Sequence, residues 1–104
     1  MYSLDWKAQT AKETREKNLL RRYNLDWNSM MDILEHQGYQ CPIMLTPLTE
    51  WDAHCDHSHN DGYVRGLLSS GANLGLGHLG DSIENLERAI QYLKDYEEWR
   101  DNER

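Results

Sequence analysis

The dipeptide Asp61-Gly62 lies in the middle of the most informative stretch of this 104-residue chain. Glycine tolerates the positive φ that tight turns require, and Asp-Gly between extended runs is a strong turn signal. On its two sides lie His57-Ser58-His59 and the extended run from Tyr63 to Leu68. The pattern predicts a β-hairpin that follows an irregular loop and presents a pair of histidines beside its turn.

Two helices are predicted before the hairpin. Thr10 and Glu13 have capping-box spacing, and residues 11–22 are rich in helix-forming side chains. Asp26 is a suitable N-cap for a second helix that ends at Gly38. The apolar stripe of this second helix, which we expect in the core, consists of Trp27, Met30, Met31 and Leu34.

Two further helices are predicted after the hairpin. A short helix interrupted by glycines runs through Asn73, and a longer one follows the capping pair Asp81 and Glu84. The apolar residues of the longer helix are Ile83, Leu86, Ile90 and Leu93. No linker interrupts the chain, so we expect one α+β domain, mostly helical, with N-terminal helices (1–38), a hairpin-helix core (39–79) and a C-terminal helix (80–104).

The composition of the chain indicates its location in the cell. No apolar run is long enough to span a bilayer, and residues 1–18 lack the apolar core of a signal peptide. We therefore expect a cytoplasmic protein that has no membrane partner. Two cysteines in such a protein are expected to be free thiols.

Charge is distributed unevenly along the chain. The net charge is -7, which argues against gripping nucleic acid through bulk electrostatics. Residues 1–23 nevertheless hold six basic and three acidic side chains, a local charge of +3. This basic segment is either a nucleic-acid contact, with Arg21 and Arg22 as candidate residues, or the solvated face of a charged helix, and both interpretations stay open.

Four side chains around the hairpin could carry chemistry: Asp56, His57, His59 and Asn73. Asp and Asn supply the oxygen ligands that suit Mg²⁺, an ion that keeps several of its waters. Imidazole exchanges protons near neutral pH and can activate a water molecule. Together these residue types provide what metal-assisted phosphodiester hydrolysis requires.

Ordered motifs across the chain resemble the bacteriophage recombination endonuclease VII family, whose fold is the ββα-metal (HNH) type. The motifs are DHSH, VRGLL, Asn73, LGHLGD and AIQYL, preceded by a similar lead-in helix, LRRYNLDWNSMMDILEHQGYQC. The resemblance covers roughly residues 19–93. It implies a Mg²⁺-dependent DNA endonuclease, with Mn²⁺ as a possible substitute, encoded by a phage and acting in the cytoplasm of its bacterial host.

The resemblance also assigns roles to individual residues. It implies that Asp56 and Asn73 bind the catalytic metal, that His57 is the general base, and that His59 positions or polarises the phosphate. Arg65 lies in the VRG element, where it contacts a backbone phosphate or braces the hairpin. His78 does not match the metal-binding Asn of the family and is interpreted as a surface residue or as a neighbour of the metal ligands that does not bind the metal itself.

The chain departs from the family at its structural zinc site. Members usually carry two Cys-x-x-Cys pairs, but the matching segments here are Cys41-Pro42-Ile43-Met44 and Ser69-Ser70-Gly71-Ala72. One thiolate of four cannot hold tetrahedral zinc, so we expect no structural zinc. Apolar packing among Cys41, Ile43, Met44 and Ala72, or a subunit interface, is expected to compensate.

Several alternatives remain open on the sequence alone. An unrelated zinc site could use His54, Cys55, His57 and His59, although strand alternation points neighbouring side chains to opposite faces. Cys55 is otherwise a small buried strand residue. A non-catalytic nucleic-acid or protein binding module, or a toxin or defence nuclease, could share the fold. The DNA substrate is duplex or branched, and we expect a homodimer.

Overall fold

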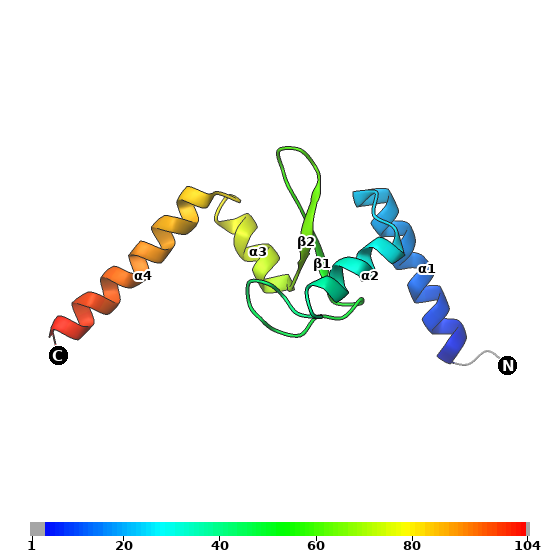
Figure 1. The fold of residues 1–104 in the computed structure, drawn as a ribbon, viewed down its shortest axis with the longest axis horizontal. Helices are drawn as coiled ribbons and strands as arrows, with labels where there is room; N and C mark the ends of the chain where they lie inside the picture. The colour runs from blue at the N-terminus through cyan, green and yellow to red at the C-terminus, as the bar shows by residue number, and fades with distance from the viewer. Residues whose placement is uncertain (1–3, 104) are drawn as a thin grey trace. The chain divides into compact units, whose positions relative to one another are not determined.

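A computed structural model describes residues 4–103, with side chains from residue 7 onward (Figure 1). The elements in chain order are α1 (Leu4–Tyr23), α2 (Trp27–His36), β1 (His54–His57), β2 (Val64–Leu68), α3 (Ser70–His78) and α4 (Ile83–Glu103). This order confirms a mostly helical α+β fold with a β-β-α segment in its middle. Two compact units, Met1–Ala72 and Asn73–Arg104, divide the chain. The assignment of one domain stays a prediction.

Helix α1 is longer than predicted. It begins at Leu4, so Thr10 lies inside the helix and is not its N-cap. The capping-box prediction was wrong because the helix-forming composition continues upstream of Thr10. The hydroxyl of Thr14 donates back to the Thr10 carbonyl at 3.0 Å, as threonines inside helices do.

Helix α2 matches its prediction closely. The Asp26 carboxylate accepts a hydrogen bond from the backbone N–H of Ser29 at 2.8 Å, which confirms Asp26 as the N-cap. Gly38 has a φ of +69°, a conformation that glycine adopts without strain, just after the helix ends. Met30 and Leu34 are fully buried and anchor the core, while Trp27 and Met31 are half-buried.

The first unit contains the hydrophobic core. Residues from α1, α2, the loop before β1, both strands and the start of α3 contribute to it. The buried apolar residues are Leu19, Leu25, Met30, Leu34, Cys41, Leu48, Ala53, Cys55, Leu67, Leu68 and Ala72. The core therefore holds the hairpin against the two N-terminal helices.

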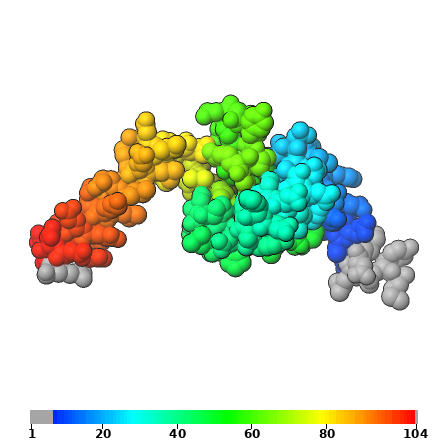
Figure 2. Space-filling view, viewed as in Figure 1, coloured from blue at the N-terminus to red at the C-terminus, as the bar shows by residue number. Residues whose placement is uncertain are grey.

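Strands β1 and β2 form the predicted antiparallel hairpin. Its register pairs His54 with Leu68 and Asp56 with Gly66, and then shifts so that His57 pairs with Val64. Gly62 has a φ of +78°, which confirms the turn at Asp61-Gly62. In Figure 2 this turn, in green, projects from the remainder of the first unit.

Helix α4 dominates the second unit. Ser82 is its N-cap, because the Ser82 hydroxyl accepts from the Asn85 N–H at 3.1 Å, so the prediction of Asp81 as the cap was one residue early. None of the described α4 side chains is buried. Among the described residues, no helix is both long enough and apolar enough to cross a membrane.

Candidate active site

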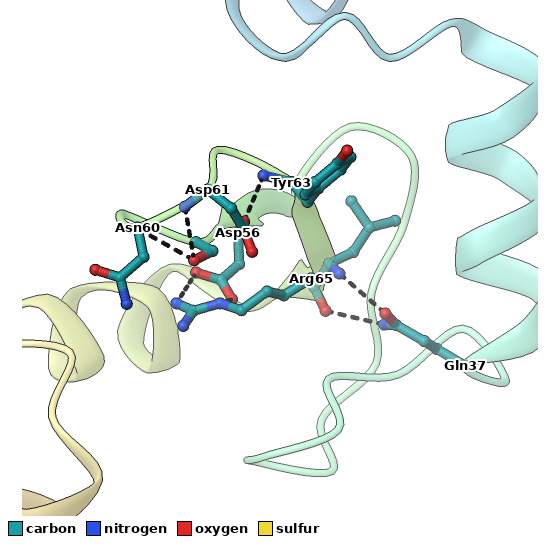
Figure 3. A network of polar contacts seen from close by, with 8 residues as sticks. Gln37, Asp56, Asn60, Asp61, Tyr63 and Arg65 are labelled. Atoms are coloured by element: carbon teal, nitrogen blue, oxygen red, sulfur yellow. Dashed lines mark hydrogen bonds and ion pairs between the residues drawn. The ribbon is translucent and has the colours of Figure 1, made fainter.

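The end of β1 places two of the predicted chemical residues next to each other. Asp56 and His57 are the last two residues of this strand, and both are partly buried. The Asp56 carboxylate accepts two hydrogen bonds from the Arg65 guanidinium, from Nε at 2.8 Å and from Nη2 at 2.9 Å (Figure 3). The side chains of Asp56 and Arg65 are 12% and 39% exposed, so this bidentate ion pair lies at the edge of the hairpin.

A β-bulge explains how Arg65 reaches Asp56. Asp56 pairs with Gly66 and His57 pairs with Val64, which leaves Arg65 as the extra residue of β2. A bulge bends the strand locally and changes the direction of the extra side chain. Of the two roles that the sequence left open for Arg65, the contact with Asp56 supports bracing of the hairpin.

His57 makes its contacts with rings. Its imidazole lies 5.4 Å from the Tyr23 ring, measured between centroids, and 5.3 Å from the His59 ring. Tyr23 is the last residue of α1, so the N-terminal helix supports the proposed base directly. No sequence pattern singled out Tyr23, because a Tyr at the end of a charged helix has no distinguishing feature.

The turn after β1 fixes the backbone that carries His59. The Ser58 hydroxyl accepts from the N–H groups of Asn60 and Asp61 at 3.2 and 3.4 Å. The Asp61 carboxylate in turn accepts from the Tyr63 N–H at 2.9 Å (Figure 3). Such local side-chain bonds are the reason that Ser and Asp favour turns.

Gln37 is a second residue that the sequence did not indicate. Its side-chain amide accepts from the Leu67 N–H and donates to the Leu67 carbonyl, both at 2.9 Å. It thus joins the end of α2 to β2, as Figure 3 shows. A side chain at Gly66 would put a Cβ 3.0 Å from the Gln37 Oε1, so glycine leaves room for this contact.

Cys55 is buried in β1, as predicted for a small strand residue. Burial, with a contribution from the Asp56 charge, raises the pKa of the Cys55 thiol to about 11. A thiol of such high pKa stays protonated near neutral pH and is a poor metal ligand. Within the described part of the chain no three His, Cys, Asp or Glu side chains gather as a metal-binding group, so the unrelated zinc site has no support.

The remaining predicted residues lie on helices. Arg21 and Arg22 are exposed in the last turn of α1. The Nη2 of Arg21 donates to the Asn18 side chain at 3.3 Å.

Asn73 lies in α3 as the first residue of the second unit, so its role as a partner of Asp56 stays a prediction. His78 ends α3 and is exposed, in agreement with its interpretation as a surface residue.

The segments that match the family's cysteine pairs do not fit a zinc ion. Cys41 is fully buried, and Ala72, which has no ligating atom, is buried beside the start of α3. Ile43 and Met44 are 51% and 56% exposed, so the prediction that they pack in place of zinc was wrong. Exposed side chains cannot compensate for a lost metal by burial.

Hydrogen bonds surround the Cys41 sulfur instead. The Met44 N–H donates to Cys41 Sγ at 3.4 Å. Burial raises the pKa of the Cys41 thiol, but hydrogen bonds from Ser69, Met44 and Ile43 outweigh burial and lower this pKa to about 7. The Ser69 hydroxyl also accepts from the Ala72 N–H at 3.3 Å and so caps α3. Cys41 and Ser69 together tie the loop after α2 to α3.

Comparison with known proteins agrees with this arrangement. The family model described as recombination endonuclease VII matches residues 16–95. The "Gene 59 protein" of Mycobacterium phage D29 is 35% identical over 92 residues, which are 86% of this chain and 56% of that protein. The "Gene 59 protein" of Mycobacterium phage L5 is 36% identical over 89 residues, 84% of this chain and 52% of that protein.

The chain therefore spans about half the length of these curated relatives. No solved structure matches it. The family model covers most of the chain and includes both strands, α3 and the whole Asp56-to-Asn73 segment. On the order of its motifs, its β-β-α segment and this match, the chain belongs to the recombination endonuclease VII family.

Proposed function

We propose that this protein is a divalent-metal-dependent DNA endonuclease that hydrolyses phosphodiester bonds, with Mg²⁺ as the ion and Mn²⁺ as a substitute. The observation that carries the proposal is the pair Asp56 and His57 at the end of β1, opposite the bulge in β2, with Asp56 oriented by Arg65. Asp56 and Asn73 are the proposed metal ligands, His57 is the proposed general base, and His59 positions the phosphate.

The residues present fit a hard divalent cation. A carboxylate offers roughly four lone-pair positions, and the two bonds from Arg65 leave the others open to a metal. Mg²⁺ keeps several waters and takes few protein ligands, so an Asp and an Asn suffice without a larger acidic cluster. When bound, the ion would neutralise charge on the phosphate and on the leaving oxygen.

The chain's own residues have separate tasks in this proposal. Arg65 holds the Asp56 carboxylate in one orientation through its two bonds. Tyr23 and His59 restrict the His57 ring, which accepts a proton from the attacking water. His59 is exposed at the turn, where it can meet a phosphate oxygen of an incoming strand.

The proposed substrate is branched DNA, which the protein would resolve, or duplex DNA, which it would nick, and the protein is proposed to act in the host cytoplasm as a homodimer. The test is cleavage of supercoiled plasmid and of a four-way junction with Mg²⁺, Mn²⁺ or EDTA. We expect metal-dependent cutting that falls about 10²- to 10⁴-fold in His57→Ala, the usual contribution of a general base. The matched control is His78→Ala, which removes an exposed imidazole from the end of α3.

A well-folded protein that cuts neither substrate under any of these conditions would contradict the proposal. The fold would then belong to a binding module, and retained affinity for DNA would identify its ligand. Cutting of plasmid with no preference for the junction would keep the nuclease and remove branched DNA as its substrate.

A further inference from the structure

A cavity of about 610 Å³ opens between α1 and the start of β1 within the first unit. Its polar lining includes Thr14, Arg15, Asn18, Arg22 and His54, and none of the described acidic side chains lines it. Cavities of this size are typical of ligand sites. On a chain with a net charge of -7, a cavity lined by two arginines and no carboxylate is a distinctive local environment.

Neither arginine of the cavity forms an ion pair with a described residue, although Asp52 and Glu50 act on the Arg15 charge from beyond ion-pair distance. Arg15 donates from Nη2 to the Ala53 carbonyl at 2.8 Å, but its buried Nε finds no hydrogen-bond acceptor among the described residues. Arg22 is exposed and makes no hydrogen bond or ion pair within the described part of the chain. Guanidinium groups in this condition are suited to a phosphate, which accepts several of their N–H bonds.

The cavity adjoins the proposed catalytic residues. Tyr23 lines the cavity and also contacts the His57 ring at 5.4 Å between centroids. His54, another lining residue, lies two positions before Asp56 in β1 and therefore on the same face of the strand. A DNA strand held with one phosphate at Asp56 and His57 would therefore carry a flanking phosphate toward the cavity.

We infer that the cavity between α1 and β1 binds a backbone phosphate that flanks the scissile one, with Arg22 and Arg15 as its cationic contacts and Asn18 and His54 as further hydrogen-bond donors. The inference rests on the proposed function, since it takes the substrate to be DNA. Phosphate is the chemistry recognised, and a DNA strand and free inorganic phosphate are its two sources.

The test compares Arg22→Ala with Lys17→Ala, an exposed cation of the same helix that does not line the cavity. Binding of fluorescent duplex and junction DNA is measured by anisotropy in EDTA over a range of salt concentrations. For Arg22→Ala we expect Kd to rise about 3- to 10-fold, with the slope of log K against log salt reduced by about 1. For Lys17→Ala we expect less than a twofold change.

Arg15 needs a milder substitution, because its bond to Ala53 joins α1 to the loop before β1. Arg15→Lys keeps the charge but loses the guanidinium geometry, and we expect a loss of affinity smaller than that of Arg22→Ala. Thermal unfolding of each variant shows whether the fold is intact. The inference would be overturned if Arg22→Ala, Lys17→Ala and the wild-type protein bound DNA with the same Kd.

The source of the phosphate is decided by competition. Inorganic phosphate is titrated at constant ionic strength while the protein's thermal stability and DNA affinity are measured. Stabilisation by phosphate that is lost in Arg22→Ala, without any change in DNA affinity, would overturn the inference in favour of a free anion. Because binding is measured in EDTA, a loss of DNA affinity in Arg22→Ala without any Mg²⁺-dependent cutting would contradict only the proposed function.

Discussion

The hairpin and the loop around Cys41 differ in what they keep of the family pattern. At the hairpin, Asp56, His57 and His59 match the family motif in sequence, and Arg65 and Tyr23 hold the first two in place. At the loop and the start of α3, one cysteine remains at the positions that match the family's four. We infer from this difference that the proposed chemistry does not require a structural zinc in this chain.

At the Cys41 loop, hydrogen bonds are present at the positions where the family has zinc ligands. A structural zinc can contribute on the order of 10 kcal/mol to folding, so its loss requires other contacts. Here the Cys41 sulfur accepts hydrogen bonds, Ser69 caps α3, and Gln37 bonds the β2 backbone. Each is a modest contribution, and together they connect the loop after α2, β2 and α3.

We expect the greatest loss of activity from a substitution at the hairpin that leaves the Cys41 loop unchanged. Asp56→Asn removes the charge of the proposed metal ligand, and we expect DNA cleavage to fall by about 100-fold or more, since metal stabilisation of the transition state amounts to several kcal/mol. The free energy of unfolding should change by no more than ~1 kcal/mol, because the lost ion pair is partly exposed. Single-turnover cleavage and urea unfolding measure the two quantities. A loss of unfolding free energy as large as the loss of transition-state stabilisation would contradict a role for Asp56 in chemistry alone.

A smaller effect is expected from a substitution at the Cys41 loop that leaves the hairpin unchanged. Cys41→Ala leaves the Met44 N–H and the Ser69 donors without their buried acceptor, at a cost of about 1–3 kcal/mol in the free energy of unfolding. Cleavage per folded molecule should stay unchanged. Cys55→Ala is the matched control, since its buried thiol accepts no such bonds and its loss should cost less. If urea unfolding showed Cys55→Ala to be less stable than Cys41→Ala, the stabilising role proposed for Cys41 would be contradicted.

The third prediction concerns the dependence of stability on pH, which distinguishes the two thiols. The folded pKa of Cys41 is about 7 against an ordinary value of 9.0, so between these values the unfolded chain binds more protons and stability rises with pH. The folded pKa of Cys55 is about 11, so its contribution is present below pH 9 and is lost as the pH rises toward 11. Urea unfolding at pH 7, 8, 9 and 10 should show the rise in Cys55→Ala and not in Cys41→Ala.

Much of the fold was predictable because it rests on local signals. The Asp26 cap, the stripe that buries Met30 and Leu34, and the Asp61-Gly62 turn each depend on a few neighbouring residues. Errors arose at helix starts, where Thr10 and Asp81 resemble caps but lie inside α1 and just before the Ser82 cap of α4. Cap residues are common in helix interiors and loops, so the pattern alone does not locate the boundary.

The site was less predictable because its supports are distant in sequence. The motif indicated Asp56 and His57, but Tyr23 reaches His57 from α1 and Gln37 reaches Leu67 from the end of α2. The bulge that brings Arg65 to Asp56 depends on the pairing register, which no local pattern specifies. The exposure of Ile43 and Met44 has the same cause, since an apolar sequence does not reveal whether tertiary packing will cover it.

Catalysis without structural zinc is tested by the Mg²⁺-dependent cleavage of DNA by protein that has been stripped of metal with EDTA and found free of zinc by elemental analysis. We expect the stripped protein to keep its thermal unfolding temperature, and Mg²⁺ alone to restore cutting by the wild-type protein but not by His57→Ala. Unfolding on removal of metal, or cutting that returns only with zinc, would contradict the proposed chemistry and the proposed independence from zinc.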